Sequence, residues 1–144
     1  METFLERPDR CKLYYRVDDF TDPWRAAPTA LFVHGLAESS EAWRGWVPHF
    51  ARHFRVVRVD LRGFGRSTPM PAEFKWTMDA LLDDLTALIR HLGCERVHLI
   101  GAKSGGSMAL KLAADHPELV ETLVGVTPPV TGAPGAGAWL EILD

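Results

Sequence analysis

The stretch V-H-L-I-G-A-K-S-G-G at residues 97–106 decides the fold. Residues 96–100 form a short apolar run that is typical of a buried strand, and a helical pattern follows from about residue 105 to residue 115. Small residues lie on both sides of the side chain in between, and they permit a sharp turn from strand to helix. Such a turn lifts one side chain above the sheet and points the N-terminus of the next helix at the same place. We therefore expect the functional site at this turn.

Outside this stretch, the chain alternates strands with helices. The expected strands are residues 12–17, 29–33, 54–59, 96–100 and 119–126, and the expected helices are residues 40–53, 77–92 and 105–115. Strands that alternate with helices pair in parallel through right-handed crossovers, and helices then cover both faces of the sheet. The expected fold class is α/β, a three-layer sandwich with a mostly parallel sheet.

Composition excludes several classes of function. The chain has 144 residues, of which 24% are charged, and a formal net charge of −3. This acidic balance argues against nucleic acid as a partner, and no apolar run approaches the roughly 18 residues of a membrane span. Residues 1–12 lack the apolar segment of a secretory signal, and two cysteines do not make a disulfide framework. We expect a cytoplasmic protein with reduced thiols and no membrane partner.

Three motifs resemble the N-terminal half of an α/β-hydrolase-fold enzyme. They are H-G-L at residues 34–36, D-L-R-G-F-G-R-S at residues 60–67, and the stretch at residues 97–106. The chain is most similar to the branch that holds esterases, lactonases, carbon–carbon bond hydrolases, haloperoxidases and epoxide hydrolases. The resemblance implies a hydrolase that needs no cofactor or metal and acts on an ester, a lactone or a carbon–carbon bond of a small-molecule substrate.

The resemblance also implies roles for residues near the ends of the strands. The backbone N–H of Leu36, after His34 and Gly35, resembles one donor of an oxyanion hole, and the N–H of the residue after the nucleophile resembles the other. His34 is expected to order the oxyanion loop. Asp60 lines the site edge and, together with Arg62 and Ser67, is expected to hold its own turn.

The nucleophile position departs from the family pattern G-x-S-x-G. Alignment without gaps puts Lys103 where the family has Ser, Cys or Asp, and the register of the following helix favours this alignment. The N–H of Ser104 is then the second oxyanion donor. A slip of one residue puts Ser104 at the centre instead, with its acid and histidine partners beyond residue 144. A lysine there could act as a base, form a Schiff base or hold an anion, so a lyase, a decarboxylase or a binding protein is the alternative reading.

Two competing sites find no support in the sequence. A phosphate-binding loop requires G-x-x-x-x-G-K-[ST], but Val97 and Ala102 stand at the two glycine positions before Lys103. His49 and His53 have the spacing of metal ligands on a helix, yet no third ligand is evident, so we expect a solvated helix face.

Length gives the last expectation. A βα unit takes roughly 30 residues, so eight strands with their helices need roughly 240. We therefore expect residues 1–127 to be the N-terminal part of such a core, truncated after about six strands. Residues 128–144 then form a Pro/Gly-rich loop and the start of a cap or of the next helix. The strand at residues 119–126 would have an unpaired edge, which a dimer or a second chain could complete. Without such a partner, we expect the chain to be catalytically incomplete, and an inactive fragment is a further alternative.

Overall fold

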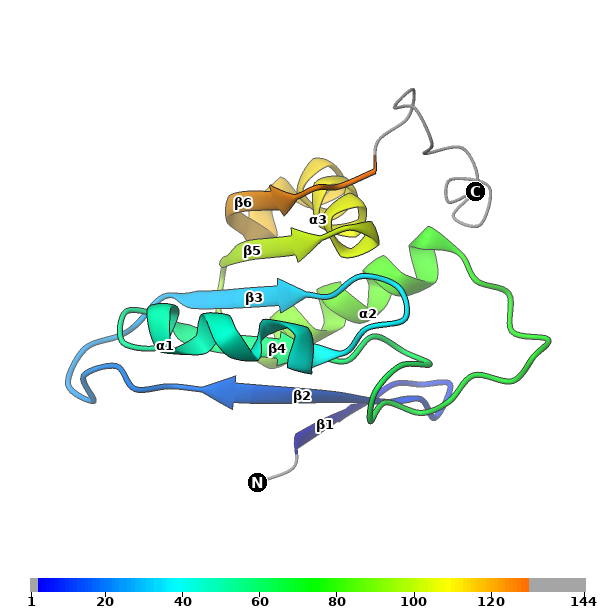
Figure 1. Ribbon diagram of the computed structural model, residues 1–144, viewed down its shortest axis with the longest axis horizontal. Helices are drawn as coiled ribbons and strands as arrows, with labels where there is room; N and C mark the ends of the chain where they lie inside the picture. The colour runs from blue at the N-terminus through cyan, green and yellow to red at the C-terminus, as the bar shows by residue number, and fades with distance from the viewer. Residues whose placement is uncertain (1–2, 130–144) are drawn as a thin grey trace.

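In the computed structural model, which describes residues 3–129, six strands form one sheet in the order β1-β2-β4-β3-β5-β6 (Figure 1). The strands are β1 Thr3–Glu6, β2 Lys12–Asp18, β3 Thr29–Val33, β4 Arg55–Val59, β5 Val97–Ala102 and β6 Val120–Val126. The helices are η1 Ser40–Trp46, α1 Val47–Phe50, α2 Met78–His91, α3 Ser104–Asp115 and η2 Pro117–Leu119. The sequence did not predict β1, a four-residue strand whose side chains alternate between half-buried and exposed.

Parallel pairing dominates the sheet. β3 pairs in parallel with β4 and β5, and β5 pairs in parallel with β6. All five residues of β3 are buried, as a central strand with helices on both faces requires. Only β1 and β2, at one edge, are antiparallel. The predicted three-layer α/β fold with a mostly parallel sheet is confirmed.

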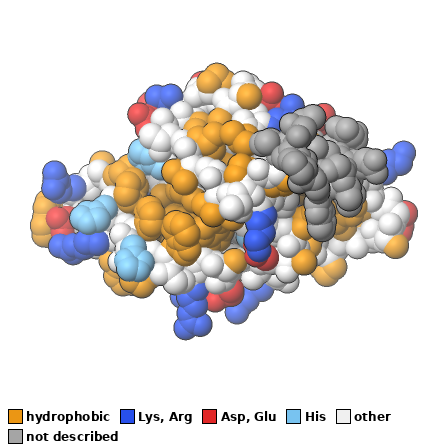
Figure 2. All heavy atoms as spheres, turned by 45° about the horizontal axis from the view of Figure 1, so that its top comes forward, with side chains coloured by type: hydrophobic (Ala, Val, Ile, Leu, Met, Phe, Trp, Pro, Cys, Tyr) orange, Lys and Arg blue, Asp and Glu red, His pale blue; other side chains and the backbone are white. Residues whose placement is uncertain are grey.

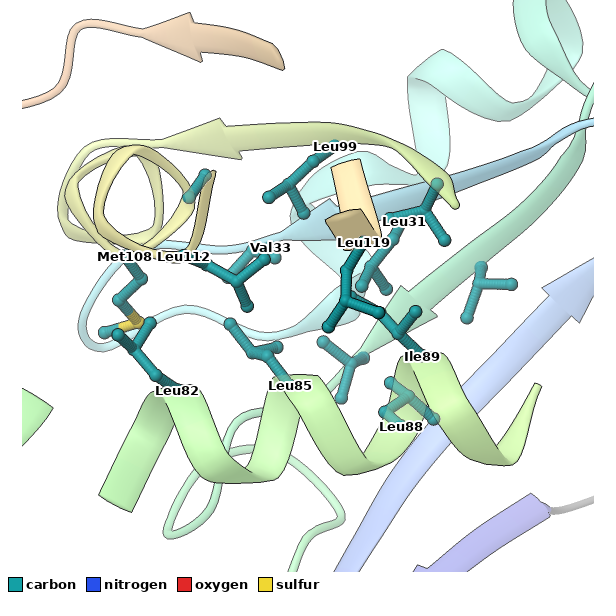
Figure 3. Packing of buried hydrophobic residues seen from close by; sticks show 14 of the residues in the cluster. Leu31, Val33, Leu82, Leu85, Leu88, Ile89, Leu99, Met108, Leu112 and Leu119 are labelled. Carbon is teal, nitrogen blue, oxygen red and sulfur yellow. The ribbon is translucent and has the colours of Figure 1, made fainter. Parts of the chain in front are cut away.

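Helices α2 and α3 cover one face of the sheet and enclose the larger core. Thr77 begins α2, because its Oγ1 accepts a hydrogen bond of 3.2 Å from the N–H of Ala80. The apolar face of α2 then meets β3, β5 and α3 (Figure 3). Side chains in this cluster include Leu31, Val33, Leu82, Leu85, Leu88, Ile89, Leu99, Met108 and Leu112. This core fixes the position of α3 and therefore of the turn that precedes it.

The opposite face carries a smaller cluster. The sequence predicted one helix over residues 40–53, and that prediction is wrong: a 3-10 turn, η1, leads into the four-residue α1. Pro48 has no N–H to donate to a carbonyl one turn earlier, so α-helical hydrogen bonding starts only at this point. Trp43, Trp46 and Phe50 nevertheless pack around Phe32, as expected from their spacing.

Hydrophobic side chains remain at the surface beside this smaller cluster, and Figure 2 shows such side chains gathered on one face of the molecule. Trp46 and Val124 are among the exposed large hydrophobic residues. Within residues 3–129, β6 pairs only with β5, so its outer edge has no partner in the described part of the chain.

The predicted loop and helix after residue 129 lie outside the described residues, and the domain division at residue 127 stays a prediction. No helix in the described part is long and apolar enough to span a membrane.

Candidate functional site

The loop after β3 is ordered by a buried histidine. His34 is fully buried, and its Nε2 accepts a hydrogen bond of 3.0 Å from the N–H of Leu61. A neutral ring that accepts at Nε2 carries its proton on Nδ1, which lies 2.7 Å from the carbonyl oxygen of Gly35 and donates to it. Burial lowers the pKa of His34, so the ring is neutral at pH 7. The structure therefore places His34 beneath the loop and engages both of its ring nitrogens there.

The turn after β4 is closed by Asp60. Its carboxylate accepts hydrogen bonds from the N–H of Ser40 (2.6 Å) and of Arg66 (2.8 Å). Ser67 donates through Oγ to the carbonyl of Asp60 at 2.6 Å. Asp60 is only 2% exposed, so its carboxylate braces two backbone segments and is shielded from solvent.

Arg62 does not contact Asp60 as the sequence suggested. Its guanidinium forms a two-pronged ion pair with the buried Asp84 at 2.6 and 2.8 Å, and it also donates to Asp9 at 2.6 Å. Asp84 lies on α2, so the acidic partner of Arg62 comes from this helix and is not Asp60, which the sequence had suggested. The two carboxylates raise the pKa of Arg62 further above its usual range.

Lys103 occupies the turn between β5 and α3. β5 ends at Ala102 and α3 begins at Ser104, while Lys103 has φ 54° and ψ −126°. This backbone conformation is unfavourable for a residue with a Cβ atom, and such strain gathers at functional sites. Of the two registers that the sequence allowed, the structure has the one that puts Lys103 at the centre of the turn.

Glycines allow α3 to approach the sheet this closely. A Cβ atom on Gly105 would lie 2.4 Å from the carbonyl oxygen of His34, and one on Gly101 would lie 2.3 Å from the carbonyl oxygen of Gly105. Both obstacles are backbone atoms, which cannot move aside as the end of a flexible side chain can. The glycines at these positions therefore hold the N-terminus of α3 against the end of β3.

Ser104 faces the loop after β3. It is 5% exposed, and its Oγ accepts a hydrogen bond of 2.8 Å from the N–H of Leu36. The expected oxyanion donor Leu36 is thus adjacent to Ser104, but its N–H is already engaged. Ser104 lies in the first turn of α3 and below the turn that carries Lys103.

Glu38 belongs to the site although no sequence pattern indicated it. Its Oε1 lies 2.5 Å from the Nζ of Lys103, and its Oε2 accepts a hydrogen bond of 2.9 Å from the N–H of Gly35. The hydrogen bond from Lys103 lowers the pKa of the Glu38 carboxyl below its usual value. The sequence offered two signals, an acid four residues after His34 and an unexpected lysine at the turn. Only the fold shows that these two side chains form an ion pair.

A pocket of about 300 Å³ opens beside these groups. It is lined by Leu36, Lys103, Ser104, Thr127 and Pro129. Asp60 and His34 do not line it. Lys103 and Ser104, the first residue of α3, thus line a small hollow near the carboxyl ends of β3 and β5, and the Glu38 carboxylate pairs with the Lys103 ammonium. Across residues 3–129, no group of three His, Cys, Asp or Glu side chains is arranged to hold a metal ion.

Comparison with known proteins fits this arrangement. The family model described as alpha/beta hydrolase fold matches residues 28–142. The match covers most of the chain, which therefore belongs to the alpha/beta hydrolase family. This confirms the resemblance that the three sequence motifs carry.

Relatives and solved structures agree. Epoxide hydrolase 3 of Xenopus tropicalis is 37% identical over 102 residues, which are 71% of this chain and 28% of that protein. The 2-hydroxymuconate semialdehyde hydrolase of Pseudomonas sp. strain CF600 is 35% identical over 70% of this chain and 38% of its own length. The crystal structure of a hydrolase from Pseudomonas aeruginosa PA01 superposes with a TM-score of 0.83 at 30% identity, covering 97% of this chain and 50% of that one. The chain thus spans half or less of the length of each of these proteins.

Proposed function

We propose that this chain supplies the oxygen-binding part of a small-molecule hydrolase site, and that Lys103 faces the reacting group of the substrate. The single observation that carries the proposal is the position of Lys103 at the centre of the strained turn between β5 and α3. Among the relatives named above are an epoxide hydrolase and a 2-hydroxymuconate semialdehyde hydrolase, which supports hydrolysis of a small molecule, and the sequence motifs favour an ester, a lactone or a carbon–carbon bond as the bond that is cleaved.

The donors suit a carbonyl oxygen that becomes negative during the reaction. The N–H of Ser104 belongs to the first turn of α3, and the N–H of Leu36 comes free when the Ser104 hydroxyl rotates away. Each donor of this kind is worth about 3–4 kcal/mol in the transition state of comparable enzymes. The Lys103 ammonium adds a full positive charge beside them.

Lys103 is not proposed as an acyl acceptor. Attack of its amine on an ester would expel the alcohol and leave an amide, which hydrolyses far more slowly than an ester. Ser104 is a poor alternative nucleophile, because it is 5% exposed and lies in the first turn of α3, one residue past the centre of the turn. We therefore assign Lys103 the role of holding and stabilising the substrate oxygen while water attacks the carbonyl carbon.

A matched pair of variants tests this assignment. Hydrolysis of 4-nitrophenyl butyrate is measured for the wild type, Lys103→Met and Ser104→Ala. We expect Lys103→Met to lose at least tenfold in kcat/KM and Ser104→Ala to stay within threefold of the wild type. Loss of activity in Ser104→Ala with activity kept in Lys103→Met would overturn the proposal. Thermal unfolding of all three proteins controls for folding.

A second candidate is a lyase or decarboxylase that works through a Schiff base. It is favoured by the same amine at the turn, which lines the pocket beside the N–H donors. The amine would add to a ketone carbonyl, and loss of water would give the imine. Borohydride reduction in the presence of 2-oxo acids should then leave a mass adduct on Lys103. An adduct absent from the wild type, or equally abundant in Lys103→Met, would exclude this candidate.

We also propose a cytoplasmic location and a partner for β6. Support for the first is that both cysteines are free and that burial raises the pKa of the Cys11 thiol, which slows its oxidation. Support for the second is the outer edge of β6, which has no partner strand within residues 3–129 and which a second copy or another chain would cover. Sedimentation at several concentrations tests for self-association, and a monomer at all concentrations would exclude the dimer.

A further inference from the structure

The Glu38 carboxylate accepts hydrogen bonds from one cation and from one backbone N–H group of the site. One oxygen lies 2.5 Å from the Lys103 ammonium and the other 2.9 Å from the backbone nitrogen of Gly35. The side chain reaches back to this place from a tight turn, in which Ala37 has φ 58° and the N–H of Glu38 donates to the carbonyl of Gly35 at 3.3 Å. The carboxylate is therefore bound in the way that a ligand carboxylate would be.

A second internal oxygen engages the neighbouring donor. The N–H of Leu36 donates to Ser104 Oγ at 2.8 Å. The two backbone N–H groups of the loop and the lysine ammonium thus all have partners, and both partners are side-chain oxygens of this chain. Leu36, Lys103 and Ser104 also line the 300 Å³ pocket, so the donor residues Leu36 and Lys103 border the space that a ligand would enter, and Gly35 precedes Leu36 in the chain.

We propose that Glu38 is an internal substitute for the carboxylate of the ligand, and that the site takes small organic carboxylates, which displace it. This inference rests on the proposed function, because it names the class of molecule that the same site holds. Exchange of the Glu38 carboxylate for a ligand carboxylate keeps an anion beside the Lys103 ammonium, so the charges of the site stay balanced. A neutral ligand offers no such exchange.

The surroundings permit the displacement. The Glu38 side chain is 26% exposed and that of Lys103 is 62% exposed, so both can turn toward water when a ligand enters. The backbone around Glu38 is not held by its carboxylate alone, because the buried His34 ring fixes the preceding residues through Gly35 and Leu61. Removing the carboxylate should therefore open the site and leave the loop in place.

The test is calorimetric titration of the full chain with benzoate, with benzamide as a neutral probe of the same shape. We expect Glu38→Gln and Glu38→Ala to bind benzoate at least tenfold more tightly than the wild type, because the competing internal carboxylate is gone. Benzamide affinity should change less than threefold. Glu41→Gln is the matched control: it removes an exposed acid from the same segment and should leave benzoate affinity within twofold.

The outcomes separate this inference from the proposed function. Unchanged or weaker benzoate binding in both Glu38 variants would overturn the inference, as would no detectable binding by any variant. Equal tightening in Glu41→Gln would also overturn it, since it would reflect net charge alone. Because binding is measured without turnover, tighter benzoate binding in proteins that hydrolyse no ester would keep the inference and reject the proposed function.

Discussion

The turns after β4 and β5 lie at the same edge of the sheet, and each carries a charged residue, yet they are built differently. Asp60, after β4, is 2% exposed, and backbone N–H groups satisfy both carboxylate oxygens. Lys103, after β5, has a side chain that is 62% exposed, a strained backbone and one ion-pair partner. The Lys103 backbone is hydrogen-bonded to Val126 and to the first turn of α3, but within residues 3–129 its ammonium pairs only with Glu38.

The contrast separates stability from function. A charged group whose hydrogen bonds are all made within the protein stabilises the fold and is not available to bind a ligand. A charge on a strained turn beside a pocket, held by a single exchangeable carboxylate, is available for binding. The following predictions test this division from the side of the closed turn first.

Arg62→Ala should be the most destabilising change. It takes the two-pronged partner from the buried Asp84 carboxylate and leaves it only Arg7, whose Nε lies 2.9 Å from Asp84 Oδ1. Because one charged partner remains, we expect a loss of about 3 kcal/mol, the lower end of the range for breaking a buried ion pair. Urea unfolding measures the loss. The control is Arg16→Ala, which removes an exposed pair at 3.4 Å and should change the free energy of unfolding by less than about 0.5 kcal/mol. Similar losses of unfolding free energy in both variants would mean that the buried ion pairs of Arg62 do not stabilise the turn after β4.

Gly105→Ala should destabilise the protein, because the added methyl group overpacks the turn between β5 and α3. The new methyl group would meet the backbone carbonyl of His34, and overpacking of this kind costs about 1–3 kcal/mol. Gly45→Ala is the matched control, because nothing lies within 4 Å of the added atom there. Thermal unfolding compares the two variants. Equal stability would show that α3 does not approach the sheet as closely as described.

Lys103→Gly should be more stable than Lys103→Ala by about 1 kcal/mol. Both variants lose the ion pair with Glu38, but only glycine adopts φ 54° and ψ −126° without strain, and this gain outweighs its greater freedom in the unfolded chain. Chemical denaturation of the two variants measures the contribution of backbone strain, because both have lost the same ion pair. A Lys103→Gly protein that is less stable than Lys103→Ala would contradict the description of the turn as strained.

The buried histidine should make stability depend on pH. Burial lowers the pKa of His34 in the folded state below its usual 6.5, so between those two pKa values the unfolded chain binds the additional proton. The contribution of His34 is complete above pH 6.5 and is lost as pH falls below it. Free energies of unfolding at pH 7.5 and 5.5 should differ more in the wild type than in His34→Gln. An equal difference in both proteins would place the acid sensitivity elsewhere.

Much of this could be predicted from the sequence, because local patterns decide it. The apolar run of β3 and the capped periodicity of α2 act over short distances, so the parallel sheet followed from them, whereas the small residues around Lys103 and Ser104 left two registers of the turn open. A proline interrupted the first predicted helix, and β1 was too short to show a pattern. Asp84 and Glu38 could not be found, since each meets its partner from a distant part of the chain.

The most direct test of the account is an NMR titration of the backbone amides with benzoate in the wild type, Lys103→Met and Ser104→Ala. The account predicts that the Leu36 and Ser104 amide signals shift in the wild type, that Ser104→Ala keeps the affinity within threefold, and that Lys103→Met loses it at least tenfold. Benzoate binding that survives in Lys103→Met and disappears in Ser104→Ala would contradict the claim that Lys103 is the working side chain of this site.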